Sequence, residues 1–126
     1  MLRFAVVLGI SLLVPAVAHS DKSFNGGKGA TWDCATDPVV VITGGSTKYT
    51  LKGTCKSITI TGGHNTLAIE SATTLDVTGA SNTISIDAVD AININGAGNK
   101  ITWKKGKSVP KPSVSQLGQN NVIVQG

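Results

Sequence analysis

The sequence predicts an all-β fold, a single-domain β-solenoid made of coils of about 17 residues with short parallel strands. Two observations lead to this prediction. The composition is 14% charged and 4% aromatic with 15 glycines among 126 residues, which is typical of strands and turns and not of helical bundles. Short runs in which apolar and polar residues alternate also recur at a constant spacing, which indicates strands that bury one face.

The repeating unit occupies residues 58–69, 75–86 and 92–103, each copy 17 residues after the last. Every copy has two pairs of large apolar residues at spacing two, with a glycine and an asparagine between the pairs. This pattern predicts two strands joined by a turn. Because such a unit is too short to bury its own apolar side chains, the copies are expected to stack on one another.

Partial copies flank the three full ones and set the expected domain limits of 32–126, with a cap at the carboxyl end. Residues 40–51 keep the glycine, have Thr47 in place of the asparagine and contain one extra residue in the connection that follows. Residues 120–124 repeat the second half of the unit after an insertion with two prolines, and residues 32–34 resemble a preceding half-coil. An antiparallel β-sandwich or barrel is the alternative, since regularly spaced short strands also suit those folds.

The recurring glycine and asparagine both have a structural interpretation. The glycines lie at the bend between strands, where a positive φ or a close approach of the backbone requires a residue without Cβ. The asparagines are expected to lie one above another and to bond through their side-chain amides along the solenoid axis. The turn glycines are Gly44, Gly62, Gly79 and Gly96, and the asparagine ladder is Asn65, Asn82 and Asn99.

The amino end has the pattern of a secretory signal peptide over residues 1–18. A short basic start is followed by an apolar run over residues 4–14, and Ala16-Val17-Ala18 provides a small-x-small cleavage site. We therefore expect a mature chain that starts near His19 with a lead-in over residues 19–31. It would be secreted or periplasmic in a bacterium, with no transmembrane segment after cleavage.

Cys34 and Cys55 are the only cysteines. Because an exported protein meets an oxidising compartment, a single disulfide between them is expected. Closing a loop of this length stabilises a fold by roughly 3 kcal/mol in the chain-entropy model.

Several segments resemble the domain of unknown function 3060 family. They are the recurring Thr-Gly-x-x-Asn-Thr-Ile unit, Gly53-Thr54-Cys55 and the late Gly-Gln-Asn-Asn-Val-Ile-Val stretch, and the likeness runs from about Cys34 to Val124. The resemblance implies a small exported bacterial protein with a β repeat and a cysteine pair. It transfers no catalytic residue, because no activity is established for that family.

The residues themselves indicate no catalytic, cofactor or metal site. His64 occupies a turn position that holds serine or glycine in other copies, so a solvated turn residue is expected. Glu70 and Asp87 fall in one outward column between Lys52 and Lys104. Exposed and stacked, these acids suit a surface ion-pair ladder better than the acid and base of a glycosidase cleft. We therefore expect a protein without enzymatic activity or cofactor.

Charge gives the remaining indication of function. Once residues 1–18 are removed every basic residue other than histidine is lysine, and the loss of arginine argues against nucleic-acid recognition. The hypothesis is an exported, non-catalytic structural or interaction module of the bacterial envelope. Its partner is unknown, and envelope polysaccharide or self-association through the solenoid ends are the candidates. A cell-surface glycan-binding module is the alternative, and ice binding through threonine-rich faces ranks behind it. The candidate patch for an anionic partner is Lys100, Lys104, Lys105, Lys107 and Lys111.

Overall fold

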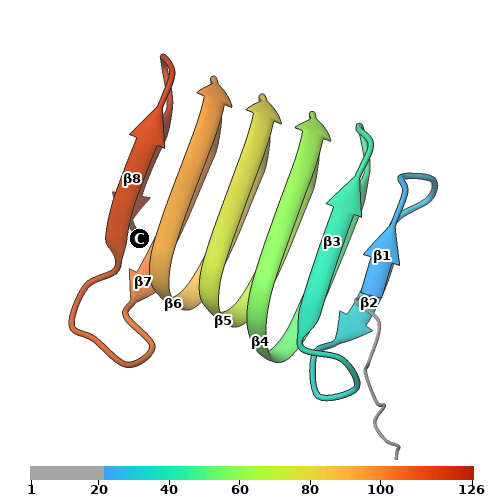
Figure 1. The fold of residues 1–126 in the computed structure, drawn as a ribbon, viewed down its shortest axis with the longest axis horizontal. Helices are drawn as coiled ribbons and strands as arrows, with labels where there is room; N and C mark the ends of the chain where they lie inside the picture. The colour runs from blue at the N-terminus through green and yellow to red at the C-terminus, as the bar shows by residue number, and fades with distance from the viewer. Residues whose placement is uncertain (1–21) are drawn as a thin grey trace, which may run out of the picture.

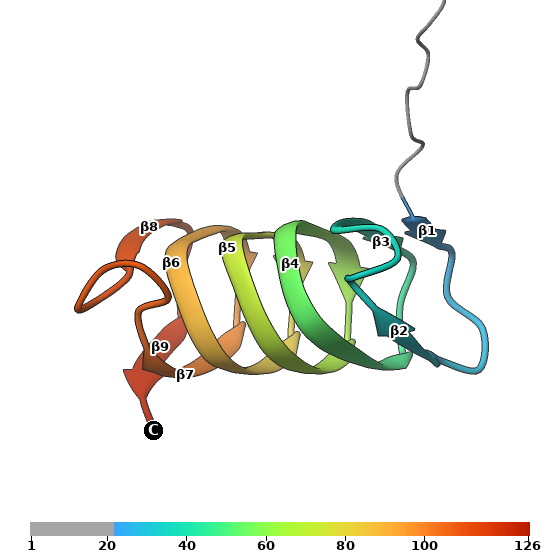
Figure 2. The same cartoon turned by 90° about the horizontal axis from the view of Figure 1, so that it is seen from below.

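The computed structural model describes residues 22–126, which form a parallel β-solenoid with no helix among them. Figure 1 shows the strands side by side, and Figure 2 shows the chain winding around the solenoid axis in successive coils. Every strand pairing is parallel, so the solenoid prediction is confirmed and the antiparallel alternative is wrong. The predicted signal peptide at residues 1–18 lies outside the described residues. The strands are β1 (Lys22–Phe24), β2 (Ala30–Asp33), β3 (Val39–Thr43), β4 (Lys48–Gly63), β5 (Thr66–Ala80), β6 (Thr83–Ala97), β7 (Lys100–Lys105), β8 (Ser113–Leu117) and β9 (Val122–Gln125).

The three long strands β4, β5 and β6 each bend around a corner and supply both faces of the solenoid. Their second halves pair with β1, β3 and β8 in what we call face A, where Ile58 lies beside Leu75 and Leu75 beside Ile92. Their first halves pair with β2, β7 and β9 in face B, where Leu67 lies beside Ile84. Both faces keep the 17-residue offset because each coil adds one strand to each of them.

The core is the space between the two faces, filled by the inward side chains of the alternating pattern. Each inward position forms a column of apolar side chains along the axis, and almost all of them are inaccessible to solvent. Parallel pairing in register places like residues beside like residues, so one coil buries the apolar surface of the next. The face A columns hold Val40, Ile58, Leu75 and Ile92 and also Ile42, Ile60, Val77 and Ile94, and the face B columns hold Tyr49, Leu67, Ile84 and Ile101 and also Leu51, Ile69, Ile86 and Trp103.

The corner between the faces adds a third inward column of smaller side chains. Cys55, Ala72 and Val89 pair in register there and are fully buried. Cys34 joins Cys55 through the expected disulfide, with the two Cα atoms 5.0 Å apart. The disulfide is thus confirmed, and it links the first coil to the second inside the core.

The first coil begins earlier in the chain than the repeat pattern alone indicates. Strand β1 pairs with β3, and β2 pairs with β4, so the coil already contains Lys22 within the segment expected to be a lead-in. The extra residue after the 40–51 copy appears as an irregularity in the pairing between Leu51 and Thr54. Gly53 occupies it with a φ of 77°, a backbone conformation that favours glycine.

Within residues 22–126 no helix has the length and apolar character needed to cross a membrane. The buried disulfide is consistent with folding in an oxidising compartment.

Candidate functional site

The asparagine column lies at the turn that leads from face A to face B, and its side chains are buried. Asn65 donates its backbone N–H to the Oδ1 of Asn82 at 3.0 Å, and Asn82 does the same to Asn99 at 3.0 Å. The side-chain Nδ2 of Asn82 donates to the carbonyl oxygen of Gly62 in the preceding coil, also at 3.0 Å. Each amide therefore satisfies both a donor and an acceptor of the turn below it, which is a structural role.

The ladder is longer than the sequence pattern indicates. Asn121 accepts the backbone N–H of Asn99 at 3.1 Å and donates its Nδ2 to the carbonyl of Gly96 at 3.0 Å. The insertion before β8 stretches the spacing from 17 to 22 residues and hides this fourth member, although the Asn-Asn-Val-Ile-Val motif marks it. At the other end Thr47 donates its backbone N–H to Asn65, and its hydroxyl turns back to the carbonyl of Gly45.

The turn before each ladder residue has two positions with positive φ. The first is the turn glycine, where an added Cβ would overlap the carbonyl of the glycine in the preceding coil, as at Gly79 against Gly62. The second holds His64, exposed at the surface with a φ of 60°. The glycines Gly44, Gly62, Gly79 and Gly96 have φ values of 114°, 141°, 137° and 154°, and the second position is held in other coils by Ser46, Ser81, Gly98 and Asn120 with φ values of 56° to 67°.

The acids on face B form part of a shallow hollow of about 250 Å³ near the corner. Glu70 accepts the backbone N–H of Gly53 at 2.7 Å. Asp87 forms an ion pair with Lys104 at 3.5 Å, with the side chains 52% and 64% exposed, an arrangement that contributes little to stability. Lys52 and Ser85 line the same hollow, so hydroxyl, carboxylate and ammonium groups share this surface.

A second hollow of about 430 Å³ lies on face A towards the carboxyl end. Asn93 donates its Nδ2 to Asp76 at 2.7 Å across adjacent coils, and Leu117 closes the far side. Thr59 pairs in register with Asp76, so the Thr-x-Thr pattern of one coil does not continue into the next.

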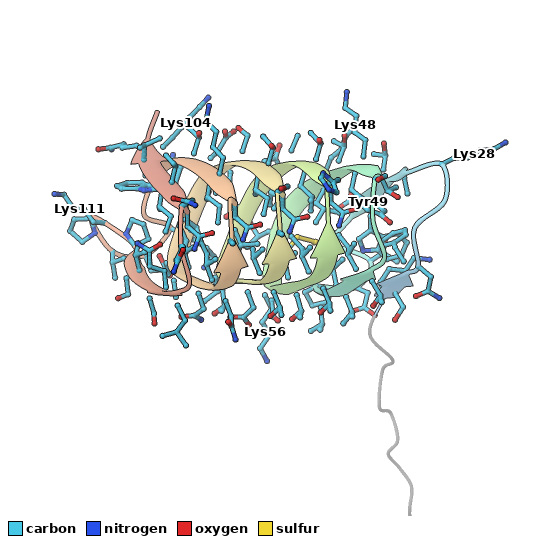
Figure 3. All side chains as sticks on the ribbon, turned by 90° about the horizontal axis from the view of Figure 1, so that it is seen from above. Lys28, Lys48, Tyr49, Lys56, Lys104 and Lys111 are labelled. Atoms are coloured by element: carbon cyan, nitrogen blue, oxygen red, sulfur yellow. A yellow bond between two sulfur atoms is a disulfide. The ribbon has the colours of Figure 1, made fainter. Side chains whose placement is uncertain are left out.

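The lysine patch (Lys100, Lys104, Lys105, Lys107 and Lys111) surrounds β7 and the connection that follows it, and all five residues are exposed. Residues 91–126 contain these five lysines and neither aspartate nor glutamate. Figure 3 shows Lys104 and Lys111 at the carboxyl end of the solenoid, both pointing away from the ribbon. The patch therefore presents a positive surface at one end of the molecule.

Asp90 holds the base of the connection between β7 and β8. Its Oδ1 accepts the backbone N–H groups of Lys107 at 2.8 Å and Ser108 at 2.6 Å. The hydrogen bond from the Ser108 backbone is the main cause that lowers the pKa of Asp90, and the Ser108 hydroxyl and Lys107 add to it while partial burial opposes it. Asp90 thus stays ionised and anchors the lysine-bearing connection.

The two ends of the solenoid differ in their side chains. At the amino end the ammonium of Lys22 lies 5.1 Å from the ring centroid of Phe24 and 4.7 Å from that of Trp32, so it covers the aromatic residues of the first coil. At the carboxyl end β8 and β9 form what we call the C-terminal coil. Its exposed apolar side chains are Val114, Leu117, Val122 and Val124, at 45%, 67%, 47% and 43%.

Among residues 22–126, no group of three or more histidine, cysteine, aspartate or glutamate side chains is placed to hold a metal ion. His64 lies alone at its turn, and the carboxylates of Glu70 and Asp90 are bonded to backbone N–H groups.

The family comparison agrees with this repeat architecture. A model described as a protein of unknown function, DUF3060, matches residues 42–86 and again residues 72–120, which together span more than half of the chain. The chain belongs to the DUF3060 family. Two overlapping matches of one DUF3060 model are what a 17-residue repeat produces, because the same pattern fits at more than one offset. No curated protein and no solved structure matches the chain.

Proposed function

We propose that this DUF3060 protein is an exported, non-catalytic interaction module of a bacterial cell envelope that binds its partner at the carboxyl end. The observation that carries the proposal is the lysine patch, five exposed lysines in residues 91–126 without a single acid among them. An uncompensated positive surface attracts an anionic partner and speeds its approach.

Export is supported by the signal-peptide pattern of residues 1–18 and by the buried disulfide between Cys34 and Cys55. An exported chain of this size gains from a disulfide because its small core leaves little spare stability. The expected location is the periplasm or the cell exterior. Fractionation of a bacterium that expresses the full chain tests this, since export predicts a processed, oxidised protein outside the cytoplasm and retention of the leader in the cytoplasm contradicts it.

The absence of catalysis in this proposal is supported by the use of the acids on the surface. Glu70 and Asp90 each accept backbone N–H bonds, and Asp87 pairs with Lys104 in the open. A glycosidase instead needs an acid and a base that face each other across a substrate cleft. Incubation with envelope polysaccharides should release no new reducing ends, and release above background would contradict the proposal.

A glycan-binding module is the second candidate, favoured by the hollow on face B. Its lining of Thr50, Ser85, Glu70 and Asp87 offers the hydroxyl and carboxylate groups that bind sugar hydroxyls. The two candidates place the binding surface in different parts of the solenoid, so one pair of variants separates them.

The test is co-sedimentation of the mature, oxidised protein with a bacterial envelope fraction at about 0.05 M and about 0.5 M salt. The Lys100→Glu/Lys104→Glu variant reverses charge at the carboxyl end. Lys48→Glu/Lys52→Glu makes the same change of charge nearer the amino end, on face B, and alters Lys52 in the hollow. Salt-sensitive retention lost only in the first variant supports the proposed function, whereas loss only in the second favours glycan binding. No retention of the unmodified protein would remove both candidates.

A further inference from the structure

The C-terminal coil repeats the backbone geometry of the coils inside the stack. Gly118 has a φ of 118°, and an added Cβ there would overlap the carbonyl of Gly96, as at the other turn glycines. Asn120 has a φ of 60°, and Asn121 continues the ladder. This coil therefore has the conformation needed to receive another strand on its outer side, although no residue of 22–126 pairs with that side.

The direction of the backbone groups in β9 shows what the outer edge offers. Val122 donates its N–H to Asn99 at 2.8 Å, and Gly126 donates to Trp103 at 2.7 Å, so both groups face inward along the stack. Successive backbone groups of a strand alternate in direction, and those of Asn121, Ile123 and Gln125 therefore face the open edge. These unpaired donors and acceptors are a template for an added strand.

Side chains beside this edge suit a polypeptide strand. Val122 and Val124 are exposed on its outer surface at 47% and 43%, and Ile123 is partly buried against the core. An added strand with apolar residues at its inward positions would extend the core by one layer. A polysaccharide offers neither the regular backbone ladder nor the alternating apolar contacts.

Charge selects the kind of strand. Lys100 and Lys104 point outward from β7, which is one strand spacing from β9. A strand added to β9 would lie about 10 Å from β7, a distance that a lysine side chain can largely cover. Two copies of this chain placed with their carboxyl ends together would bring two lysine patches into contact, and like charges repel.

The amino end of a second copy also fits poorly. Lys22 covers Phe24 and Trp32 there, and the turn at residues 25–29 supplies no asparagine to the ladder. In the first coil the backbone N–H of Gly26 is bonded to the hydroxyl of Tyr49 at 3.2 Å. An acidic strand from another protein therefore matches the open edge better than either end of this chain.

We propose that the outer edge of β9 binds an extended, acidic segment of a partner polypeptide as an added β-strand. Acidic side chains of the segment face Lys100 and Lys104, and apolar side chains pack beside Ile123. This inference rests on the proposed function and specifies its partner.

The test uses a fluorescent peptide of about eight residues in which valine alternates with glutamate, titrated with the mature, oxidised protein and followed by anisotropy. One control peptide replaces each glutamate with lysine. A second keeps the glutamates but is N-methylated at alternate backbone nitrogens, which prevents formation of the ladder and keeps the charge. We expect saturable binding of the first peptide and at least about tenfold weaker binding of both controls.

Protein variants locate the peptide. Gln125→Pro removes an N–H that faces the open edge, where proline is tolerated, while Gln125→Ala keeps it. We expect loss of binding in the first and normal binding in the second. Lys100→Glu/Lys104→Glu should weaken binding by at least about tenfold, and Lys48→Glu/Lys52→Glu should leave it unchanged. Melting curves of each variant confirm that the solenoid is intact.

Three results would overturn the inference. They are an absence of binding, equal binding of the N-methylated peptide, and equal weakening by the two double lysine variants. If the peptide fails while envelope retention still depends on Lys100 and Lys104, the proposed function stands and its partner is an anionic polymer. If envelope retention fails as well, both proposals fall.

Discussion

The ladder position requires an amide for a reason that lies in the bonding pattern of the turn. The residue must accept the backbone N–H of the preceding ladder residue and donate to a glycine carbonyl in that same preceding coil. A carboxylate can only accept, and a threonine hydroxyl is too short to reach both groups. Thr47 fits at the start of the ladder because its hydroxyl bonds only to its own turn, at Gly45.

The first prediction concerns Asn82, which is fully buried. Asn82→Ala leaves the N–H of Asn65 and the carbonyl of Gly62 without partners inside the turn. We expect the free energy of unfolding to fall by about 2 to 4 kcal/mol, measured by urea denaturation. Asn121→Ala at the half-buried end of the ladder should cost clearly less, and equal losses would contradict the structural interpretation.

The second prediction separates a clash from backbone strain at glycine. Gly79→Ala would place a Cβ against the carbonyl of Gly62, at a φ of 137°, whereas Gly27→Ala has a φ of 96° and no atom within 4 Å of the new Cβ. We expect about 1 to 2 kcal/mol of destabilisation at Gly27 and more than about 3 kcal/mol at Gly79. Thermal unfolding of the two variants measures the difference. Similar losses would show that the coils can shift apart without penalty.

At the scale of one element, each coil depends on its neighbours and not on its own contacts. Face A and face B each contribute two inward apolar side chains per coil, and these pack mainly against the coils before and after. Stability in such a stack is close to a sum of coil and interface contributions. The first coil has only one neighbour, and the disulfide of Cys34 with Cys55 ties it to the second coil.

The third prediction follows for the disulfide. Cys34→Ala/Cys55→Ala removes a link across 21 residues, and we expect a loss of about 3 kcal/mol. Because the stack responds locally, hydrogen exchange should accelerate in β1, β2 and β3 more than in β6. A uniform acceleration over all strands would mean that the solenoid unfolds only as a whole.

At the scale of the whole molecule, the two ends of the stack have different chemistry. The amino end is covered by Lys22 over aromatic rings, while the carboxyl end offers an open strand edge beside the lysine patch. Positive charge near an exposed strand edge is also a known protection against edge-to-edge aggregation. The same lysines can thus exclude copies of the chain and attract an acidic segment.

The fourth prediction is a monomer at low salt. Light scattering of the mature, oxidised protein over a concentration series at about 0.05 M salt should give the mass of one chain, because the Debye length there exceeds about 10 Å and the lysine patches repel. Lys100→Glu/Lys104→Glu should shift the protein towards association. Concentration-dependent growth of the unmodified protein would contradict this interpretation and point to the solenoid ends as self-association surfaces.

Much of the fold could be predicted from the repeat, and the exceptions have clear causes. The apolar pairs, the turn glycines and the 17-residue spacing are local patterns, so they predict the strands and their stacking. The corner column escaped because Ala72 and Val89 are small and lie outside the alternating runs. Asn121 escaped because an insertion breaks its spacing, and β1 because the first coil has a shorter turn of different composition.

The sequence by itself determined the coil, because alternation and repetition are properties of neighbouring residues along the chain. Only the tertiary structure decided which groups remain unpaired. The open edge of β9 and its position beside Lys100 depend on strands brought together from residues 22 apart. The bonding of Asp90 to the connection after β7 likewise depends on contacts between coils. A binding surface made of such contacts becomes visible only when the coils are stacked, since the backbone groups it uses are identical in every residue.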